Sequence, residues 1–194
     1  PQGRGLGASA SLATAITRAF YDFFETKLPQ SDLMFYANFS ENITHGKSSG
    51  IDVATVNSEQ PLWFIKDTAI EPFELNLHGF IVIGDTGVHG FTSQAINIVR
   101  EKLVEEKKKT QAHINQLGEL ATASKNFLMT NQLSAFGKVM NKAHGILSEL
   151  GVSHPRLETL VDTALKNGAL GAKLTGSGLG GVMVALAENE KDAI

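Results

Sequence analysis

The first residues that could do chemistry form a glycine-rich stretch that leads directly into a run with helical spacing. Gly3-Arg4-Gly5-Leu6-Gly7 is followed by Ala8-Ser9-Ala10-Ser11. Glycines allow a tight turn and a close approach to a ligand, and the free N–H groups at the start of a helix attract anions. The hydroxyl groups of Ser9 and Ser11 could add hydrogen bonds. The stretch predicts a phosphate-binding loop, although a glycine turn that caps a helix would give the same pattern.

Two carboxylates, Glu41 and Asp52, lie eleven residues apart on either side of a break that contains Gly46 and Gly50. Such a pair could converge on a metal-bound phosphate, one as a magnesium ligand and the other as a proton acceptor. By spacing alone, a simpler explanation is favoured, in which Glu41 is a solvated helix residue and Asp52 a turn or cap residue.

A third glycine-rich stretch, Gly176-Ser177-Gly178-Leu179-Gly180-Gly181, formally satisfies the dinucleotide pattern Gly-x-Gly-x-x-Gly. An apolar run follows it where a helix should begin, and only thirteen residues remain where the complete unit needs about 30. We therefore expect a hairpin whose turn approaches a phosphate or the first helix. Gly46-Lys47-Ser48 fails as a Walker A loop, because Glu41 stands where that motif requires glycine.

The composition excludes several classes of protein. Of 194 residues, 42% are hydrophobic and 19% charged, which fits a soluble globular protein and excludes a disordered chain. The net charge of −3 argues against nucleic acid or an anionic membrane surface as the main partner, and favours a small ligand. The absence of cysteine excludes disulfides, thiolate zinc sites and a cysteine nucleophile. No apolar run approaches the ~20 residues of a membrane span, and we expect a cytoplasmic protein.

The elements that must position these residues come in groups. Helical spacing is expected at residues 8–28, 31–44, 92–149 in several helices, and 155–166, with a short helix or turn at 51–56. Strands are expected at residues 62–65, 79–83, 171–175 and 182–186. The charged stretch Glu105–Lys109 is expected to be a solvated turn, and Trp63 a core residue. This grouping indicates an α+β fold rather than a regular βαβ alternation.

The six histidines lack His-x-x-x-His spacing, so a histidine metal site is not expected. His45 is interpreted as a residue that shapes its loop by hydrogen bonding.

Taken together, the glycine-rich stretches resemble the motifs of the GHMP kinase family. Pro1-x-Gly3-x-Gly5-Leu6-Gly7-x-Ser9-Ala10 resembles the phosphate-loop motif Pro-x-x-x-Gly-Leu-Gly-Ser-Ser-Ala. His45-Gly46-x-x-Ser49-Gly50-Ile51-Asp52 resembles His-Gly-x-Pro-Ser-Gly-x-Asp, and Lys173-Leu174-Thr175-Gly176-Ser177-Gly178-x-Gly180-Gly181 resembles Lys-Leu-Thr-Gly-Ala-Gly-Gly-Gly-Gly. Asn141-x-x-His144-x-x-Leu147-x-x-Leu150-Gly151-Val152-Ser153 is similar to the subgroup of the family that acts on mevalonate.

The sequence departs from these motifs at a few positions. Ala8 replaces the first serine of the phosphate loop, and Lys47-Ser48 replaces Asn-Pro. In the third motif Ser177 replaces alanine and Leu179 replaces a glycine, which affects the path of that turn. None of these changes removes a residue that the resemblance implicates in catalysis or in metal binding.

The resemblance implies the GHMP kinase fold, with a ribosomal-protein-like N-terminal domain, here incomplete, over residues 1–80 and a ferredoxin-like C-terminal domain over residues 81–194. It places the site between the two domains. It implies that Asp52 is the catalytic base and that Ser9 and Glu41 ligate Mg²⁺. It further implies that the ATP phosphates are bound at Gly3, Gly5, Leu6, Gly7, Ala8 and Ser9. Candidates on the substrate side, or in the third glycine loop, are Thr92, Gly176, Ser177 and Gly178.

The activity that the resemblance implies is magnesium-dependent transfer of a phosphoryl group from ATP to the primary hydroxyl of mevalonate, giving 5-phosphomevalonate for isoprenoid synthesis. Its partners would be these small molecules, and a homodimer is compatible with it. Phosphomevalonate or a sugar as the acceptor, or a non-catalytic nucleotide-binding remnant, are the alternatives. Family members also carry an N-terminal lysine and a Gly-Glu-His segment that these 194 residues lack, so we expect the sequence to be part of a longer chain.

Overall fold

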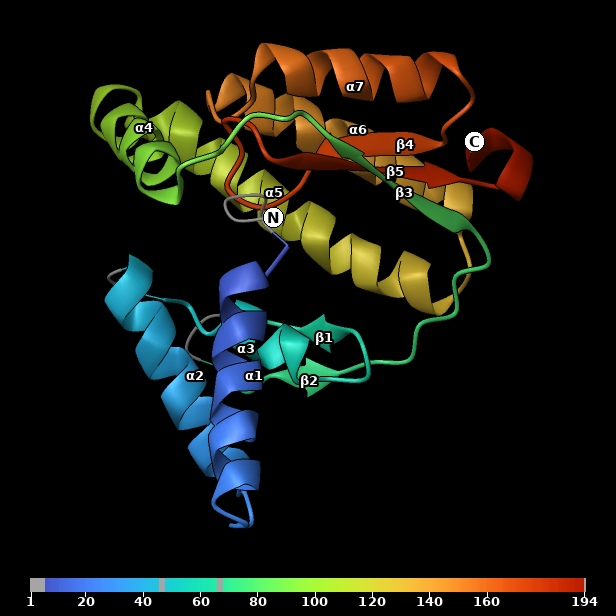
Figure 1. Cartoon of the computed structure of the whole chain (residues 1–194). Helices are drawn as coiled ribbons and strands as arrows, with labels where there is room; N and C mark the ends of the chain where they lie inside the picture. The colour runs from blue at the N-terminus through green and yellow to red at the C-terminus, as the bar shows by residue number, and fades with distance from the viewer. Residues whose placement is uncertain (1–5, 46–47, 66–67, 194) are drawn as a thin grey trace. The chain divides into compact units, whose positions relative to one another are not determined.

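The computed structural model of the protein describes residues 6–45, 48–65 and 68–193, and these form two compact units (Figure 1). The first unit runs from residue 6 to Glu74 and the second begins at Leu75. The domain bounds 1–80 and 81–194 stay a prediction. In the described part of the chain, no helix is both long enough and apolar enough to cross a membrane.

The first unit contains helices and one small antiparallel sheet. Its elements are α1 (Ala8–Phe23), α2 (Gln30–His45), α3 (Ile51–Val56), β1 (Leu62–Trp63) and β2 (Glu71–Pro72). The three expected helices are confirmed. The strand β2 was not predicted, because a Glu-Pro pair has low β propensity. Trp63 is half-buried rather than a core residue, so that expectation was wrong.

The helix α1 ends at Phe23, earlier than the expected end at residue 28. Glu25 adopts the left-handed conformation with φ 49°. The N–H group of Thr26 donates to the carbonyl oxygen of Tyr21 at 2.9 Å, a contact typical of a C-terminal helix cap. The helix therefore ends before the helical spacing of apolar residues in the sequence ends.

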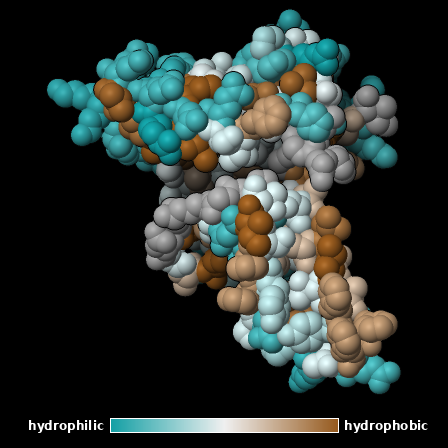
Figure 2. Space-filling model, turned by 60° about the vertical axis from the view of Figure 1, so that its left-hand side comes forward, coloured by the Kyte–Doolittle hydropathy of each residue, from teal (hydrophilic) through white to brown (hydrophobic). Residues whose placement is uncertain are grey.

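The core of the first unit consists of small side chains from three helices. Ala10 and Ala13 of α1, Ala37 of α2 and Val53 of α3 form one buried cluster. Small residues let helix backbones approach closely. Most of the large apolar side chains of α1 and α2, together with Phe24 directly after α1, are exposed: Leu12, Ile16, Phe20, Phe23, Phe24, Phe35, Tyr36, Phe39 and Ile43. In Figure 2 apolar side chains, in brown and tan, lie open at the surface.

The second unit combines a three-stranded sheet with longer helices. Its elements are β3 (Phe80–Asp85), α4 (Thr92–Glu105), α5 (Lys107–Met129), α6 (Leu133–Glu149), α7 (Pro155–Lys166), β4 (Gly171–Leu174), β5 (Val182–Ala187) and the short 3₁₀ helix η1 (Glu190–Ala193). The expected solvated turn at Glu105–Lys109 is confirmed in part, because these residues are exposed and the helical conformation stops at Glu106, but the other residues of the stretch belong to helices. Only Glu106 separates α4 from α5, and Thr110 is buried with its hydroxyl bonded to the Lys102 carbonyl at 3.0 Å. The run of charges marks a solvated surface, and the helix break within it is limited to one residue.

The strands of the second unit are antiparallel and lie in the order β3-β5-β4. The hairpin expected from the third glycine-rich stretch is confirmed, with Leu174 of β4 opposite Met183 of β5. Helices α6 and α7 pack on this sheet (Figure 1). The core between them consists of Leu157, Val161, Ala172, Leu174, Met183 and Ala185.

Candidate active site

The phosphate-loop candidates that the structure describes lie at the start of α1. Gly7 caps the helix in the left-handed conformation (φ 65°), and a Cβ atom there would lie 3.3 Å from the Val56 side chain. The backbone N–H and the hydroxyl of Ser11 both donate to the Gly7 carbonyl, at 2.9 and 3.0 Å. The N–H groups of Ala8 and Ser9 belong to the first turn, where helices lack internal partners. The helix start thus has the donors that an anion requires.

Some of the expected phosphate-loop residues cannot be placed. Gly3 and Gly5 lie outside the described residues, as do Gly46 and Lys47. Leu6 is exposed, next to the capping glycine, and Ser9 is half-buried.

Glu41 lies in the second half of α2 and is only 3% exposed. The simpler explanation from spacing, a solvated helix residue, was therefore wrong. A carboxylate is costly to bury unless a cation or hydrogen-bond donors compensate its charge. Its position is therefore not that of a surface residue.

Asp52 lies in the first turn of the short helix α3 and is exposed. The capping residue of this helix is Gly50 (φ 83°), so Asp52 is not the cap. The hydroxyl of Ser49 accepts a hydrogen bond from the N–H of Ile51 at 3.4 Å, which helps to fix the turn. The positive end of the helix dipole favours a negative charge at this position.

The candidates of the first unit lie close in the sequence to residues of its small-residue core. Ser9 adjoins Ala10, and Asp52 adjoins Val53, both members of the buried cluster. Glu41 lies one helical turn after Ala37, the cluster's contribution from α2. The first half of α1, the middle of α2 and the short helix α3 therefore meet around one cluster.

A hydrogen bond holds α1 and α2 together at their other end. The hydroxyl of Tyr21 donates to the Asp32 carboxylate at 2.8 Å. The neighbouring carboxylate raises the pKa of Tyr21 to about 12. The two helices are therefore antiparallel neighbours, fixed at both ends.

Asn57 is a positioning residue that the sequence did not reveal. Its Nδ2 donates to the Thr14 hydroxyl at 3.0 Å and to the Val53 carbonyl at 2.9 Å, and its Oδ1 accepts from Arg18 at 3.2 Å. These bonds join the end of α3 to α1 and so fix the helix that carries Asp52. The one available signal was an asparagine directly after a short apolar helix.

In the second unit, the third glycine-rich stretch forms the turn between β4 and β5. Gly176, Gly178 and Leu179 have positive φ values of 72°, 81° and 58°. The N–H of Leu179 donates to the Val152 carbonyl at 2.8 Å, and a Cβ atom at Gly178 would collide with that carbonyl. Leu179 therefore follows a glycine-like path although it replaces a glycine of the family motif.

The structure brings Thr92 to this turn. The Thr92 hydroxyl lies 3.2 Å from that of Ser177, so the two substrate-side candidates are neighbours. Thr86, which the sequence did not indicate, anchors the other end of the turn. Its N–H and hydroxyl donate to the Gly181 carbonyl at 3.0 and 2.7 Å, and its own carbonyl accepts from Arg156 at 3.0 Å.

Over the described ranges, no group of three or more histidine, aspartate and glutamate side chains could form a metal cage. A magnesium site built from one carboxylate, one hydroxyl and substrate phosphates does not need such a cage, because Mg²⁺ usually binds one or two carboxylates and keeps several waters.

Comparison with known proteins defines the class to which this fold belongs. The family model described as "GHMP kinases N terminal domain" matches residues 1–59, and the one described as "GHMP kinases C terminal" matches residues 115–194. Together they match more than half of the chain, and the chain belongs to the GHMP kinase family.

The similar proteins include several mevalonate kinases. The mevalonate kinase of Pyrococcus horikoshii is 34% identical over 192 residues, which are 96% of this chain and 57% of that protein. The crystal structure of L. major mevalonate kinase in complex with R-mevalonate is 26% identical, with a TM-score of 0.88 over 96% of this chain and 58% of the other. That of mevalonate kinase from methicillin-resistant Staphylococcus aureus MRSA252 is 36% identical, with a TM-score of 0.74 over 98% and 60%. The chain therefore spans somewhat more than half the length of these relatives.

Proposed function

We propose that the protein, at its full length, transfers the terminal phosphoryl group of ATP to the primary hydroxyl of mevalonate. The observation that carries this proposal is the 34% identity to a mevalonate kinase over 96% of this chain. Ser9 and Asp52 each adjoin in the sequence a residue of the buried cluster that joins α1, α2 and α3, which supports it. The product would be 5-phosphomevalonate.

The start of α1 would hold the phosphates of ATP. The first-turn N–H groups, including those of Ala8 and Ser9, and the positive end of the helix favour a polyanion. Because Ser11 is bonded to Gly7, its hydroxyl keeps the capping turn in shape, and the Ser9 hydroxyl is the better candidate for direct contact. Gly3, Gly5 and Leu6 would complete the loop.

Ser9 and Glu41 would hold Mg²⁺. Both offer hard oxygen ligands, which is the chemistry that this ion prefers. Glu41 is only 3% exposed and lies on α2, which packs against α1, the helix that carries Ser9. When bound, the ion would neutralise charge on the phosphates of ATP.

Asp52 would act on the acceptor hydroxyl. Its carboxylate is exposed on a helix that Asn57 and the Val53 contacts hold in place, so a substrate hydroxyl can approach it. It would accept the hydroxyl proton or orient the hydroxyl as the oxygen attacks phosphorus. In the second unit, Thr92, Gly176, Ser177 and Gly178 are proposed to bind substrate or phosphate.

The test is the variant Asp52→Asn in the full-length protein, assayed with ATP and magnesium. If Asp52 is the base, kcat for mevalonate falls by roughly 10²–10⁴-fold while the affinity for ATP changes little. The matched control is Asp22→Asn, which alters an exposed aspartate of the same unit to which no role is assigned. Unchanged kcat in Asp52→Asn would exclude it as the base.

A panel of acceptors tests which compound the protein phosphorylates. Mevalonate should be phosphorylated at a kcat/KM at least tenfold above phosphomevalonate and galactose. A preference for either of those compounds would replace mevalonate in the proposal. Binding of ATP without turnover of any acceptor would indicate a non-catalytic nucleotide-binding protein.

A further inference from the structure

The strand β4 forms one edge of the sheet in the second unit, and the glycine-rich turn follows directly after it. On an edge strand, every second residue points its backbone N–H and C=O groups away from the sheet. At β4 these groups are covered by helix α6, which packs on the strand. Buried backbone groups require hydrogen-bond partners, so side chains must supply what a neighbouring strand would otherwise provide.

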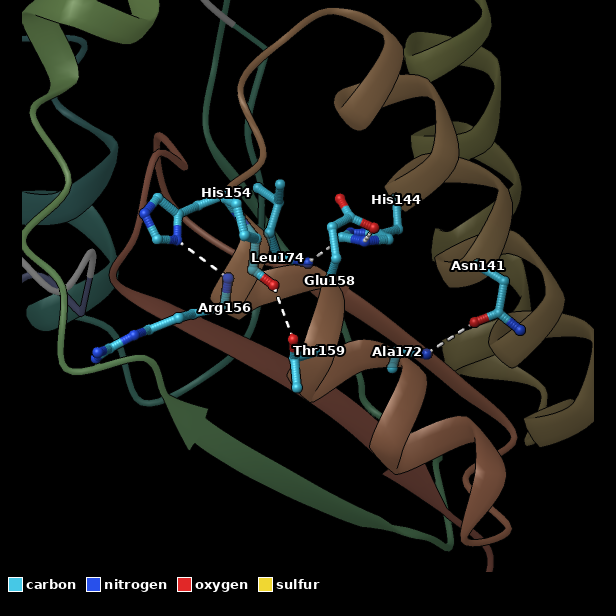
Figure 3. Close-up of polar contacts among 9 residues, drawn as sticks. Asn141, His144, His154, Arg156, Glu158, Thr159, Ala172 and Leu174 are labelled. Carbon is cyan, nitrogen blue, oxygen red and sulfur yellow. Dashed lines mark hydrogen bonds and ion pairs between the residues drawn. The ribbon is translucent and has the colours of Figure 1, made fainter.

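Asn141 of α6 supplies two of these bonds. Its Oδ1 accepts from the N–H of Ala172 at 2.8 Å, and its Nδ2 donates to the carbonyl of Leu170 at 3.4 Å. Figure 3 shows the carboxamide directed at the strand. An amide that accepts from one residue and donates to the residue two before it makes the two bonds that one residue of a parallel neighbouring strand would make.

His144 lies one helical turn further along α6 and supplies the next bond. Its Nδ1 accepts from the N–H of Leu174 at 3.3 Å, and its Nε2 lies 3.2 Å from the Glu158 carboxylate of α7 (Figure 3). Because Nδ1 is an acceptor, the ring proton belongs on Nε2, which donates to Glu158. The ring is 6% exposed, so it is held from both sides in a buried position.

Glu158 is suited to orient this ring. Burial raises the pKa of its carboxyl. The neighbouring hydroxyl groups of Ser153 and Ser148, together with His144, lower this pKa by more, so that the net shift is downward. The carboxylate therefore remains an acceptor for the Nε2 proton. The carbonyl of Leu174, the remaining polar group of this residue, accepts from the Lys173 ammonium at 2.6 Å.

We propose that Asn141 and His144 take the place of a fourth strand along the outer edge of β4. His144 would then be a positioning residue that acts through Leu174 on the glycine-rich turn beginning at Gly176. The geometric part of this inference stands on the hydrogen bonds alone. Its consequence for catalysis rests on the proposed function, in which that turn binds substrate or phosphate.

The test compares His144→Leu with His144→Asn in ¹⁵N-labelled full-length protein. Leucine removes the acceptor, whereas the Oδ1 atom of asparagine can stand where Nδ1 stood. Under native conditions, amide hydrogen exchange of Leu174 and Leu179 should accelerate more than tenfold in His144→Leu. It should return to within about threefold of wild type in His144→Asn, and Met183 on the inner strand should change little in either variant.

His113→Leu is the matched control. His113 of α5 also pairs with a glutamate, Glu149, at 3.3 Å, but it does not belong to the edge of β4. Its replacement should leave exchange at Leu174 unchanged. Equal acceleration in the control variant, or a uniform acceleration across β3, β4 and β5 in His144→Leu, would overturn the inference in favour of general destabilisation.

Two further measurements keep the inference decidable if His144→Leu does not fold. In the wild-type protein at pH 7, the ¹⁵N shifts of His144 should show a proton on Nε2 and none on Nδ1, and the opposite tautomer would overturn the inference. In the kinase assay, kcat/KM should fall at least tenfold in a folded His144→Leu variant and recover in His144→Asn. If the wild-type protein has no kinase activity, the proposed function fails, while the exchange and tautomer results still decide the role of His144.

Discussion

The two units of the chain bury different kinds of side chain. In the first unit, three alanines and one valine bring α1, α2 and α3 together, while eight large apolar side chains of α1 and α2 remain exposed. In the second unit, leucine, valine and methionine side chains fill the space between α7 and the sheet. Burying a leucine side chain contributes about 1.5–3 kcal/mol, and burying an alanine contributes far less. The second unit is thus held by its apolar core, and the first depends more on close backbone approach and polar bonds.

The largest expected difference between the units comes from truncating one apolar side chain in each. Leu157→Ala removes a fully buried side chain and should lower the free energy of unfolding of the second unit by about 2–5 kcal/mol. Phe23→Ala removes a larger side chain that is 78% exposed and should cost less than about 1 kcal/mol. Native-state amide exchange, followed separately in each unit, measures both values. Similar costs for the two variants would contradict the difference in burial.

Asn57→Ala tests the polar bonds of the first unit. The variant leaves the buried Thr14 hydroxyl without the Asn57 amide, and should cost about 1–2 kcal/mol, with the loss of protection concentrated in α1 and α3. Asn167→Ala is a close match, because Asn167 also follows a helix and its Nδ2 bonds to a carbonyl four residues earlier. It joins no second helix through that bond. Equal effects of the two variants would show that Asn57 does not connect α1 with α3.

Glu25→Gly should stabilise the first unit by about 1 kcal/mol. Glu25 occupies the left-handed position that follows α1 (φ 49°), where a side chain is strained and glycine is favoured. Asn131→Gly serves as the control in the second unit. Asn131 has a similar φ of 53°, but its Oδ1 accepts from the N–H of His78 at 2.8 Å, so its replacement should give no gain. The melting temperatures of both variants decide the prediction, which a lower value for Glu25→Gly would refute.

The smallest expected effect is a loss of stability of the second unit at acidic pH. The pKa of Glu158 is lower in the folded protein than its ordinary value, so its stabilising contribution is complete above the ordinary value. That contribution is lost as the pH falls through the lower, folded value. Because this side chain is 42% exposed, the effect should stay below about 1 kcal/mol. Unfolding measured from pH 6 to pH 3 should show a shallower decline in Glu158→Gln, and identical curves would exclude the contribution.

Much of the fold could be predicted from local signals. The helix α7 begins where Pro155 allows a first turn, and the hairpin β4–β5 follows from apolar runs on both sides of a glycine-rich turn. The exposure of Phe20 and Phe39 could not be predicted, because helical spacing shows which residues share a face but not whether anything covers that face. The merging of Glu105–Lys109 into helices depended on the burial of Thr110, a contact between two helices that the charge pattern conceals.

The candidate site likewise contains residues that the local sequence indicates and residues that only tertiary contacts reveal. Ser9 could be proposed from the glycine-rich stretch that leads into a helix, a pattern that is local in the sequence, whereas the role of Asp52 as base came from the resemblance to the family motif. The burial of Glu41 reversed the explanation favoured by spacing, since it depends on how α2 packs against its neighbours. Thr86 and Asn57 make their bonds 95 and 43 residues away, so no spacing rule could reveal them. The catalytic, metal and phosphate roles of all these residues stay predictions.

The side chains along β4 also bear on aggregation. A strand from another molecule that tried to add to this edge would have to displace Asn141 and His144 from Ala172 and Leu174, and would meet helix α6 in its path. Unprotected edge strands with apolar side chains are the usual starting points of intermolecular sheet growth. The side chains of α6 therefore protect the β4 edge of the sheet against such growth.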